Sequence, residues 1–144
     1  MLGLGNVGAG CLRLLADNRA AIEARLGATV EVRRVLVRDL HRARDVDVPP
    51  ELLTTDAGAI LRDPEIDVIV ELIGGIEPAR AYILDALAAG KHVVTANKAV
   101  LAERGAEIFA AADAAIIHID IVPEAVPCSR PTPPVQVPSR LAET

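Results

Sequence analysis

Short apolar runs of strand length alternate along this chain with longer segments in which apolar residues recur every three or four positions. The runs predict strands at residues 29–37, 67–73, 92–95 and 115–122. The periodic segments predict helices at residues 7–26, 56–61, 78–89 and 98–112. This alternation favours a doubly wound, Rossmann-like parallel α/β sheet.

Individual positions support these elements. Asp67-Val-Ile-Val-Glu-Leu-Ile73 is a near-continuous apolar run, typical of a strand covered on both faces. Asp56 is suited to cap a short helix, and Gly27 and Gly90 are placed to end helices. Pro78 lies near the first turn of its predicted helix. The apolar stripe expected on the first helix consists of Val7, Cys11, Leu14, Leu15, Ile22 and Leu26.

A glycine-rich turn, Gly3-Leu-Gly-Asn-Val-Gly8, precedes the first predicted helix. Such a turn binds a pyrophosphate when a strand precedes it and a helix N-terminus follows it, but the spacing alone also fits a simple loop. Only Met1 and Leu2 stand before it, so the first strand is largely missing. Because that strand lies in the middle of the usual sheet, we expect a gap flanked by unpaired backbone groups.

The last segment has a different composition. Six of the ten prolines lie between residues 123 and 138, and proline removes a backbone donor and fixes φ. We therefore expect a dinucleotide-binding domain at residues 1–122 and an irregular, Pro-rich tail at residues 123–144.

Composition narrows the function classes. With one Tyr, one Phe and no Trp, the core must consist of Ala, Val, Leu and Ile. The net charge of −5 provides no basic field for nucleic acid. No apolar run is long enough to span a membrane, no signal peptide is evident, and the cytoplasm is the expected location. Cys11 and Cys128 have neither metal-ligand spacing nor the number expected of a disulfide framework, so we expect no metal site.

The second predicted strand ends in the pair Arg38-Asp39, where such domains select their nucleotide. An arginine there can bind the 2′-phosphate of NADP, whereas an acidic residue can accept hydrogen bonds from the ribose of NAD. We expect NADP, with NAD also possible. A solvated Arg-Asp pair on an exposed loop is the alternative interpretation.

Two further segments carry a family resemblance, Glu71-Leu-Ile-Gly-Gly-Ile-Glu-Pro-Ala79 and Gly90-Lys-His-Val-Val-Thr-Ala-Asn-Lys98. Together with the glycine turn and Val37-Arg-Asp39, they resemble the N-terminal NAD(P)-binding domain of homoserine dehydrogenase from Met1 to about Asp113. The resemblance implies NAD(P)H-dependent interconversion of L-aspartate 4-semialdehyde and L-homoserine, a step toward threonine, isoleucine and methionine. It also implies a homodimer.

The resemblance assigns roles to particular residues. The cofactor-binding set that it implies is Gly3, Leu4, Gly5, Asn6, Val7, Gly8, Arg38, Gly74, Gly75, Thr95 and Lys98. Lys98 is also the expected catalytic residue, because its cation can stabilise negative charge developing on the substrate oxygen. A solvent-facing lysine is the alternative, although the helix dipole does not favour a cation at a helix start.

Two carboxylates near the site have no catalytic assignment. Glu71 lies within an apolar strand, where it could accept hydrogen bonds from the backbone or face the cleft at the strand's end. Glu77, directly before Pro78, is suited to the first turn of a helix.

The chain departs from the family after the sixth strand. The family continues with a catalytic domain, whereas Pro123-Glu-Ala-Val-Pro127 resembles only faintly the turn that follows. We therefore expect a truncated or frameshifted product whose sequence stops being that of the family near Ile116, inactive on its own. A non-catalytic nucleotide-binding module and a nonfunctional gene remnant are the alternatives. Aspartate-semialdehyde dehydrogenase is a poorer match, because Cys128 is badly placed for a reactive cysteine.

Overall fold

The first three residues of the chain lie in the middle of the sheet. In the computed structural model, which describes residues 1–115 and 119–121, Leu2 forms parallel bridges to two strands. One bridge joins it to Leu36 in β1 (Val35–Leu36) and the other to Glu71 in β3 (Val68–Glu71). Leu2 thereby joins two parts of the sheet that would otherwise be separate.

The remaining strands complete a parallel sheet. β2 (Leu53–Thr54) pairs with β1, while β4 (His92–Thr95) pairs with β3 and with β5 (Ile119–Ile121). With Leu2 in place, the spatial order is β2, β1, Leu2, β3, β4, β5. This is the strand order of a doubly wound dinucleotide-binding sheet, so the predicted fold class is confirmed.

The prediction of a gap in the centre of the sheet is wrong, although the first strand is as short as predicted. The backbone bonds that fill it are Leu36 N to Met1 O (2.9 Å), Gly3 N to Leu36 O (3.1 Å), Leu2 N to Val70 O (2.8 Å) and Leu72 N to Leu2 O (2.8 Å). The amino group of Met1 also donates to Arg34 O at 2.8 Å. Three residues suffice because β1, on one side, is only two residues long.

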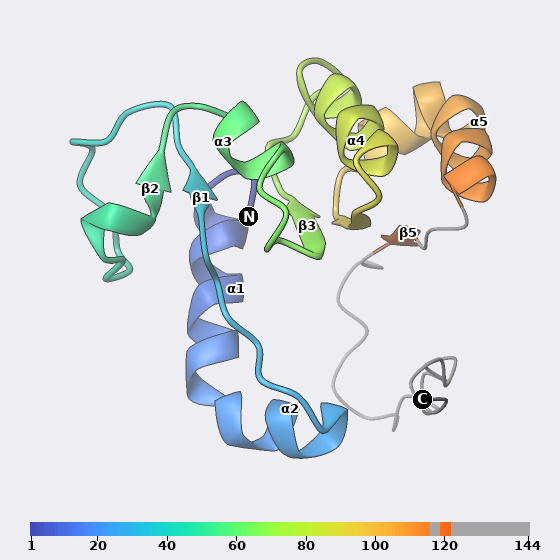
Figure 1. The fold of residues 1–144 in the computed structure, drawn as a ribbon. Helices are drawn as coiled ribbons and strands as arrows, with labels where there is room; N and C mark the ends of the chain where they lie inside the picture. Colours follow the sequence, from blue (N-terminus) through green and yellow to red (C-terminus); the bar gives the residue numbers. More distant parts are fainter. Residues whose placement is uncertain (116–118, 122–144) are drawn as a thin grey trace.

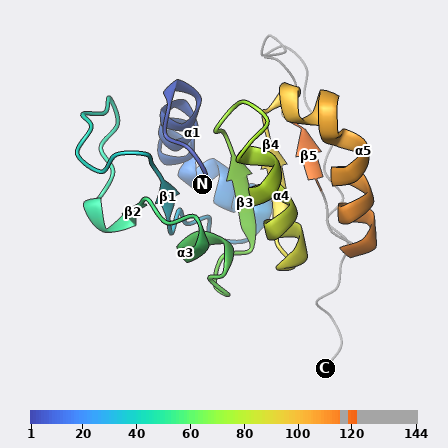
Figure 2. The same ribbon diagram turned by 90° about the horizontal axis from the view of Figure 1, so that it is seen from above.

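Helices cover both faces of the sheet (Figures 1 and 2). α1 (Asn6–Asp17) and α2 (Arg19–Leu26) follow the glycine turn and lie on one side. α3 (Gly58–Leu61), α4 (Ala79–Ala88) and α5 (Lys98–Ala115) lie on the other. A short 3-10 helix (Pro50–Leu52) leads into β2.

Two apolar clusters correspond to these two faces, because alternate residues of a strand point to opposite sides. Leu2, Ile69 and Val93 pack with the buried residues of α3, α4 and α5. Met1, Val35 and Val37 pack with residues of α1 such as Leu12. The core is aliphatic, as the composition predicts.

The first predicted helix is wrong in two respects. It breaks at Asn18, whose backbone leaves the helical region and whose side-chain amide donates to Leu14 O at 2.9 Å. The backbone N of Asn18 donates to the same carbonyl at 3.1 Å, so Leu14 O accepts two hydrogen bonds where the helix ends. The predicted apolar stripe is only in part the packed face, because Val7, Leu14 and Leu26 are 62%, 58% and 55% exposed, whereas Cys11, Leu15 and Ile22 are half-buried.

Other boundaries also shift. The strand predicted at residues 29–37 is reduced to Val35–Leu36, and β2 was not expected. Asp56 accepts a hydrogen bond from Gly58 N at 2.8 Å, one residue before the observed N-cap of α3. Gly27 and Gly90 end their helices with φ of 68° and 77°, as predicted.

Three predictions concern residues near the end of the chain. β5 lies within the strand predicted at residues 115–122. The predicted domain boundary at residue 122 and the Pro-rich tail lie outside the described residues. Among the helices of the described part, none is long and apolar enough to cross a membrane.

Candidate functional site

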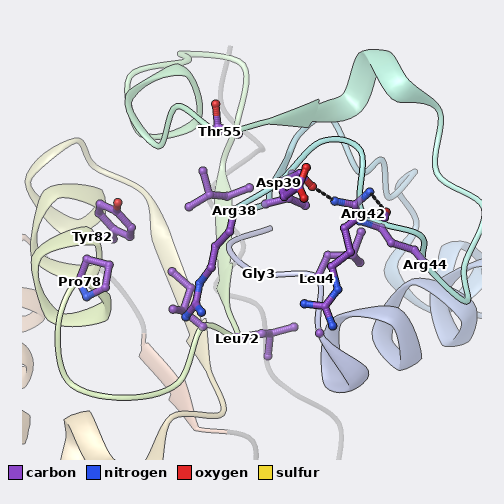
Figure 3. A pocket seen from close by; sticks show the side chains of 14 residues that line it. Gly3, Leu4, Arg38, Asp39, Arg42, Arg44, Thr55, Leu72, Pro78 and Tyr82 are labelled. Atoms are coloured by element: carbon purple, nitrogen blue, oxygen red, sulfur yellow. Dashed lines mark hydrogen bonds between the residues drawn. The ribbon is translucent and has the colours of Figure 1, made fainter.

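A pocket of about 630 Å³ opens where the carboxyl ends of the central strands meet (Figure 3). Its walls come from the glycine turn, the end of β1 with the loop that follows, and the segment after β3. Its lining residues are Gly3, Leu4, Gly5, Leu36, Val37, Arg38, Asp39, Arg42, Arg44, Thr55, Leu72, Ile73, Pro78 and Tyr82. Ligands of open parallel sheets bind in this position, outside the carboxyl ends of the strands.

The three glycines of the turn are required for different reasons. Gly3 has φ of +101°, and a Cβ there would lie 2.9 Å from Leu72 O. A Cβ on Gly8 would lie 2.5 Å from Gly3 O. A Cβ on Gly5 would meet nothing within 4 Å. The fold therefore requires Gly3 and Gly8, whereas the space above Gly5 stays open toward the pocket.

The N-terminus of α1 faces this turn. Gly5 is the N-cap, no side chain caps the helix, and no acidic residue stands in the first turn. The amide groups there keep their capacity to bind an anion, and the helix dipole favours one. These groups fit the pyrophosphate of a dinucleotide.

Arg38 and Asp39, the pair expected to select the nucleotide, differ in their hydrogen bonds. Asp39 Oδ1 accepts from His41 N at 2.8 Å, which commits one carboxylate oxygen to the loop itself. Arg38 makes no hydrogen bond or ion pair with any residue that the structure describes. The Arg38 side chain projects into the pocket (Figure 3). Arg38 and Asp39 form no salt bridge with each other and both side chains are exposed, so the choice between a nucleotide-binding arginine and a solvated Arg-Asp pair stays a prediction.

Glu71 is fully buried, and its partners decide between the two interpretations of this residue. Its Oε1 accepts from Ile73 N at 2.7 Å, and its Oε2 accepts from the Thr95 hydroxyl at 2.6 Å. The carboxylate thus accepts hydrogen bonds from inside the fold and does not face the cleft. It ties the loop after β3 to the end of β4.

Asn97 extends this network and was not identified from the sequence. Its backbone N donates to the Thr95 hydroxyl at 3.0 Å, and its side-chain amide donates to Gly75 O at 2.6 Å. Its Oδ1 accepts from Val100 N at 3.2 Å, at the start of α5. The signal was present in the sequence, because asparagine directly before a predicted helix is a preferred N-cap.

The remaining predicted site residues lie around the pocket, not in its wall. Gly74 and Gly75 follow the lining residue Ile73, with φ of 78° and 75° that favour glycine. Thr95 is buried against Glu71, and Lys98 is exposed at the first position of α5. Asn6, Val7 and Gly8 form the first turn of α1, directly after Gly5. Of the predicted set, the pocket wall contains Gly3, Leu4, Gly5 and Arg38.

Glu77 does not stand in a helix turn as predicted, since α4 begins at Ala79. Its carboxylate lies 3.4 Å from Arg80 Nη1, and Arg80 also pairs with Glu107 of α5. Glu77 therefore belongs to a surface ion-pair group that links α4 to α5.

The described part of the chain shows no other reactive or metal-binding centre. Within residues 1–115 and 119–121, no three His, Cys, Asp or Glu side chains are grouped to hold a metal. Burial raises the pKa of the Cys11 thiol, which keeps it protonated. Burial likewise lowers the pKa of the neighbouring Met1 amino group from 8.0 to about 6. Neither Cys11 nor Met1 lines the pocket.

Comparison with known proteins agrees with this geometry. Residues 3–121 match the family described as "Homoserine dehydrogenase, NAD binding domain". The chain belongs to this family. It is 51% identical over 113 residues to homoserine dehydrogenase from Synechocystis sp., covering 78% of the chain and 26% of the relative. It is 44% identical over 112 residues to the Bacillus subtilis enzyme, with the same two coverages.

Solved structures of homoserine dehydrogenases share the fold. The structure from Thiobacillus denitrificans is 48% identical, with a TM-score of 0.78, over 83% of this chain and 28% of that one. The S. aureus structure at pH 7.5 is 36% identical, with a TM-score of 0.78, over 83% and 31%. The chain spans about a quarter of the length of the curated relatives named above.

The matches also bear on the expected break near Ile116. The family match continues to residue 121. The Mycobacterium tuberculosis H37Rv enzyme is 41% identical over 136 residues that cover 91% of the chain, so that match extends into the Pro-rich segment. These two matches run past Ile116, whereas those to the B. subtilis and Synechocystis enzymes cover only 112 and 113 residues, so the break expected near Ile116 stays a prediction.

Proposed function

We propose that this chain binds NADP(H) through the pocket at the glycine turn, and NAD(H) more weakly. The observation that carries the proposal is the Arg38 guanidinium, which lies in the pocket wall without a partner among the described residues. A guanidinium forms charge-assisted, bidentate hydrogen bonds with phosphate oxygens. NAD(H) remains possible because one carboxylate oxygen of Asp39 is not used by His41 and can accept from a ribose hydroxyl.

Different parts of the site bind different parts of the dinucleotide. The amides of Gly5, Asn6 and Val7 hold the pyrophosphate, with Gly3, Leu4 and Gly8 shaping the turn. The loop at Gly74 and Gly75, held by Asn97, borders the nicotinamide side. Thr95 acts through Glu71 on the shape of this loop, and Lys98 lies at the start of α5 beside it.

For the whole protein we propose the reaction of a homoserine dehydrogenase, the name that its relatives carry. This reaction is the interconversion of L-aspartate 4-semialdehyde and L-homoserine. The nicotinamide supplies or accepts the hydride, and Lys98 stabilises negative charge on the substrate oxygen. Hydride transfer also needs the substrate held beside the nicotinamide. The matched part is about a quarter of each relative's length, so we propose that residues outside the described part hold the substrate. We place this protein in the cytoplasm, as a homodimer when whole.

Arg38→Ala is expected to weaken NADPH binding roughly tenfold to a hundredfold, because a hydrogen-bonded charge pair contributes about 1.5–3 kcal/mol. NADH affinity should change much less, since NADH has no 2′-phosphate. Fluorescence titration of the purified chain with each cofactor measures both. An equal loss of affinity for NADPH and NADH would show that Arg38 does not bind the 2′-phosphate.

Gly5→Ala is expected to leave the fold intact and to impair binding of both cofactors. The new methyl group meets nothing within 4 Å in the protein but occupies the space through which a pyrophosphate approaches the backbone. Gly10→Ala is the matched control, because a Cβ there also meets nothing and Gly10 lies outside the pocket wall. Unchanged NADPH affinity in the Gly5 variant would place the pyrophosphate elsewhere.

A non-catalytic nucleotide-binding module is the second candidate, favoured by the pocket being formed by residues 3–82 alone. Both proposals expect cofactor binding by this chain. They separate when the chain is mixed with the part of a relative that this chain does not match, since only the first expects homoserine-dependent reduction of NADP.

A further inference from the structure

The loop after β1 is held by Arg44, whose guanidinium donates to backbone carbonyl groups of the loop. Arg44 Nη1 donates to Leu40 O at 3.2 Å and to Arg42 O at 2.7 Å, and its Nη2 donates to Asp39 O. The guanidinium thus gathers the carbonyl groups of three loop residues. Asp39 Oδ1, bonded to His41 N, fixes the start of the same loop.

Arg42 is placed differently from Arg44. It lines the pocket with Arg38, and its side chain makes no hydrogen bond or ion pair with any described residue. In the close-up, Arg42 reaches from the loop toward Leu4, on the side of the pocket opposite Pro78 and Tyr82 (Figure 3).

The charges of the pocket wall do not balance within the protein. Its charged lining residues are three arginines and Asp39. The Arg44 guanidinium donates to backbone carbonyl groups, which carry no negative charge to neutralise it. Two guanidinium groups without carboxylate partners among the described residues line this pocket, and their positive charge attracts an anion. A phosphate monoester suits them, because it carries close to two negative charges and three acceptor oxygens.

We propose that Arg42 is a second specificity-determining residue for the 2′-phosphate of NADP(H), and that Arg44 is a positioning residue that holds Arg42 in place. This inference rests on the proposed cofactor function and deepens it. Arg38 and Arg42 bind the phosphate from two directions, while Arg44 makes no contact with it.

Arg42 is tested with two pairs of probes, NADPH against NADH and adenosine 2′,5′-bisphosphate against adenosine 5′-monophosphate. Arg42→Ala should weaken binding of the two 2′-phosphorylated probes roughly tenfold or more and leave the other two within about twofold. Arg42→Lys should restore part of the loss, because it keeps the charge but not the planar fork. Arg25→Ala, on the exposed surface of α2, is the control with the same change in net charge.

Arg44 is tested by Arg44→Lys, which keeps the charge but cannot donate to three carbonyl groups in the same geometry. A positioning role predicts that Arg44→Lys weakens NADPH binding as much as Arg44→Ala does, with the loss persisting at high salt. If charge alone matters, Arg44→Lys binds like the original chain, and this part of the inference is overturned.

The outcomes separate the inference from the function on which it rests. If Arg38→Ala abolishes the preference for the 2′-phosphorylated probes and Arg42→Ala does not change it, Arg42 is not a ligand and the cofactor proposal stands. If the original chain binds none of the four probes, the cofactor proposal itself fails. If Arg25→Ala weakens binding as much as Arg42→Ala does, the effect comes from the change in net charge alone. That result would overturn the inference.

Discussion

Gly8→Ala is expected to destabilise the chain by about 3 kcal/mol and to abolish cofactor binding with it. The added Cβ would lie 2.5 Å from the carbonyl oxygen of Gly3, closer than such atoms approach in proteins. Both sides of this contact are backbone, so no side-chain rotation relieves it. Either α1 or the Met1–Gly3 segment must move, and that segment holds the two halves of the sheet together.

Gly10→Ala provides the matched measurement for this variant. Both glycines lie in α1, but a Cβ on Gly10 meets nothing within 4 Å. Alanine is the better helix former, so this change should stabilise the chain by up to about 1 kcal/mol. Urea denaturation followed by far-UV circular dichroism gives both free energies of unfolding. Equal midpoints for the two variants would show that the turn does not need Gly8.

Leu2→Ala is expected to cost about 3 kcal/mol or more, within the range for a buried leucine truncated to alanine. The Leu2 side chain is fully buried in the cluster that also contains Ile69 and Val93. Its backbone pairs with β1 on one side and β3 on the other. The change removes apolar contacts at the residue whose two bridges join β1 to β3.

The control for this change is Leu14→Ala, because Leu14 lies on α1 and is 58% exposed. Its loss should change stability by no more than about 0.5 kcal/mol. Thermal melting or urea titration of the two variants provides the comparison. A Leu2 variant as stable as the Leu14 variant would mean that the sheet is held without its first residues.

Elements with strong local signals were predicted well from the sequence. β3 and β4 are apolar runs bounded by polar residues, and α4 is bounded by Pro78 and Gly90. Each signal acts over a few residues, so no distant contact was needed to recognise it. The single helix predicted at residues 7–26 is instead two helices, because the backbone leaves the helical region at Asn18, which an apolar stripe does not reveal.

The candidate site was predicted in part. The glycine turn and Arg38 were identified from their spacing, and the structure brings them into one pocket. Asn97 was missed because its main contact, with Gly75 O, joins two loops far apart in the sequence. β2 was missed because its two residues, Leu53 and Thr54, form a strand only through pairing with β1.

The sequence by itself determined the family, the alternation of strands and helices, the aliphatic core and the glycine turn. These depend on composition and on spacings within a few residues. The tertiary structure decided that Leu2 closes the sheet, because that requires β1 and β3 to come together around it. It also decided that Glu71 is an internal acceptor and that Arg44 holds a loop while Arg38 and Arg42 face the pocket. Residues of one type differ in role here through their partners, and the folded chain alone brings those partners within hydrogen-bonding distance.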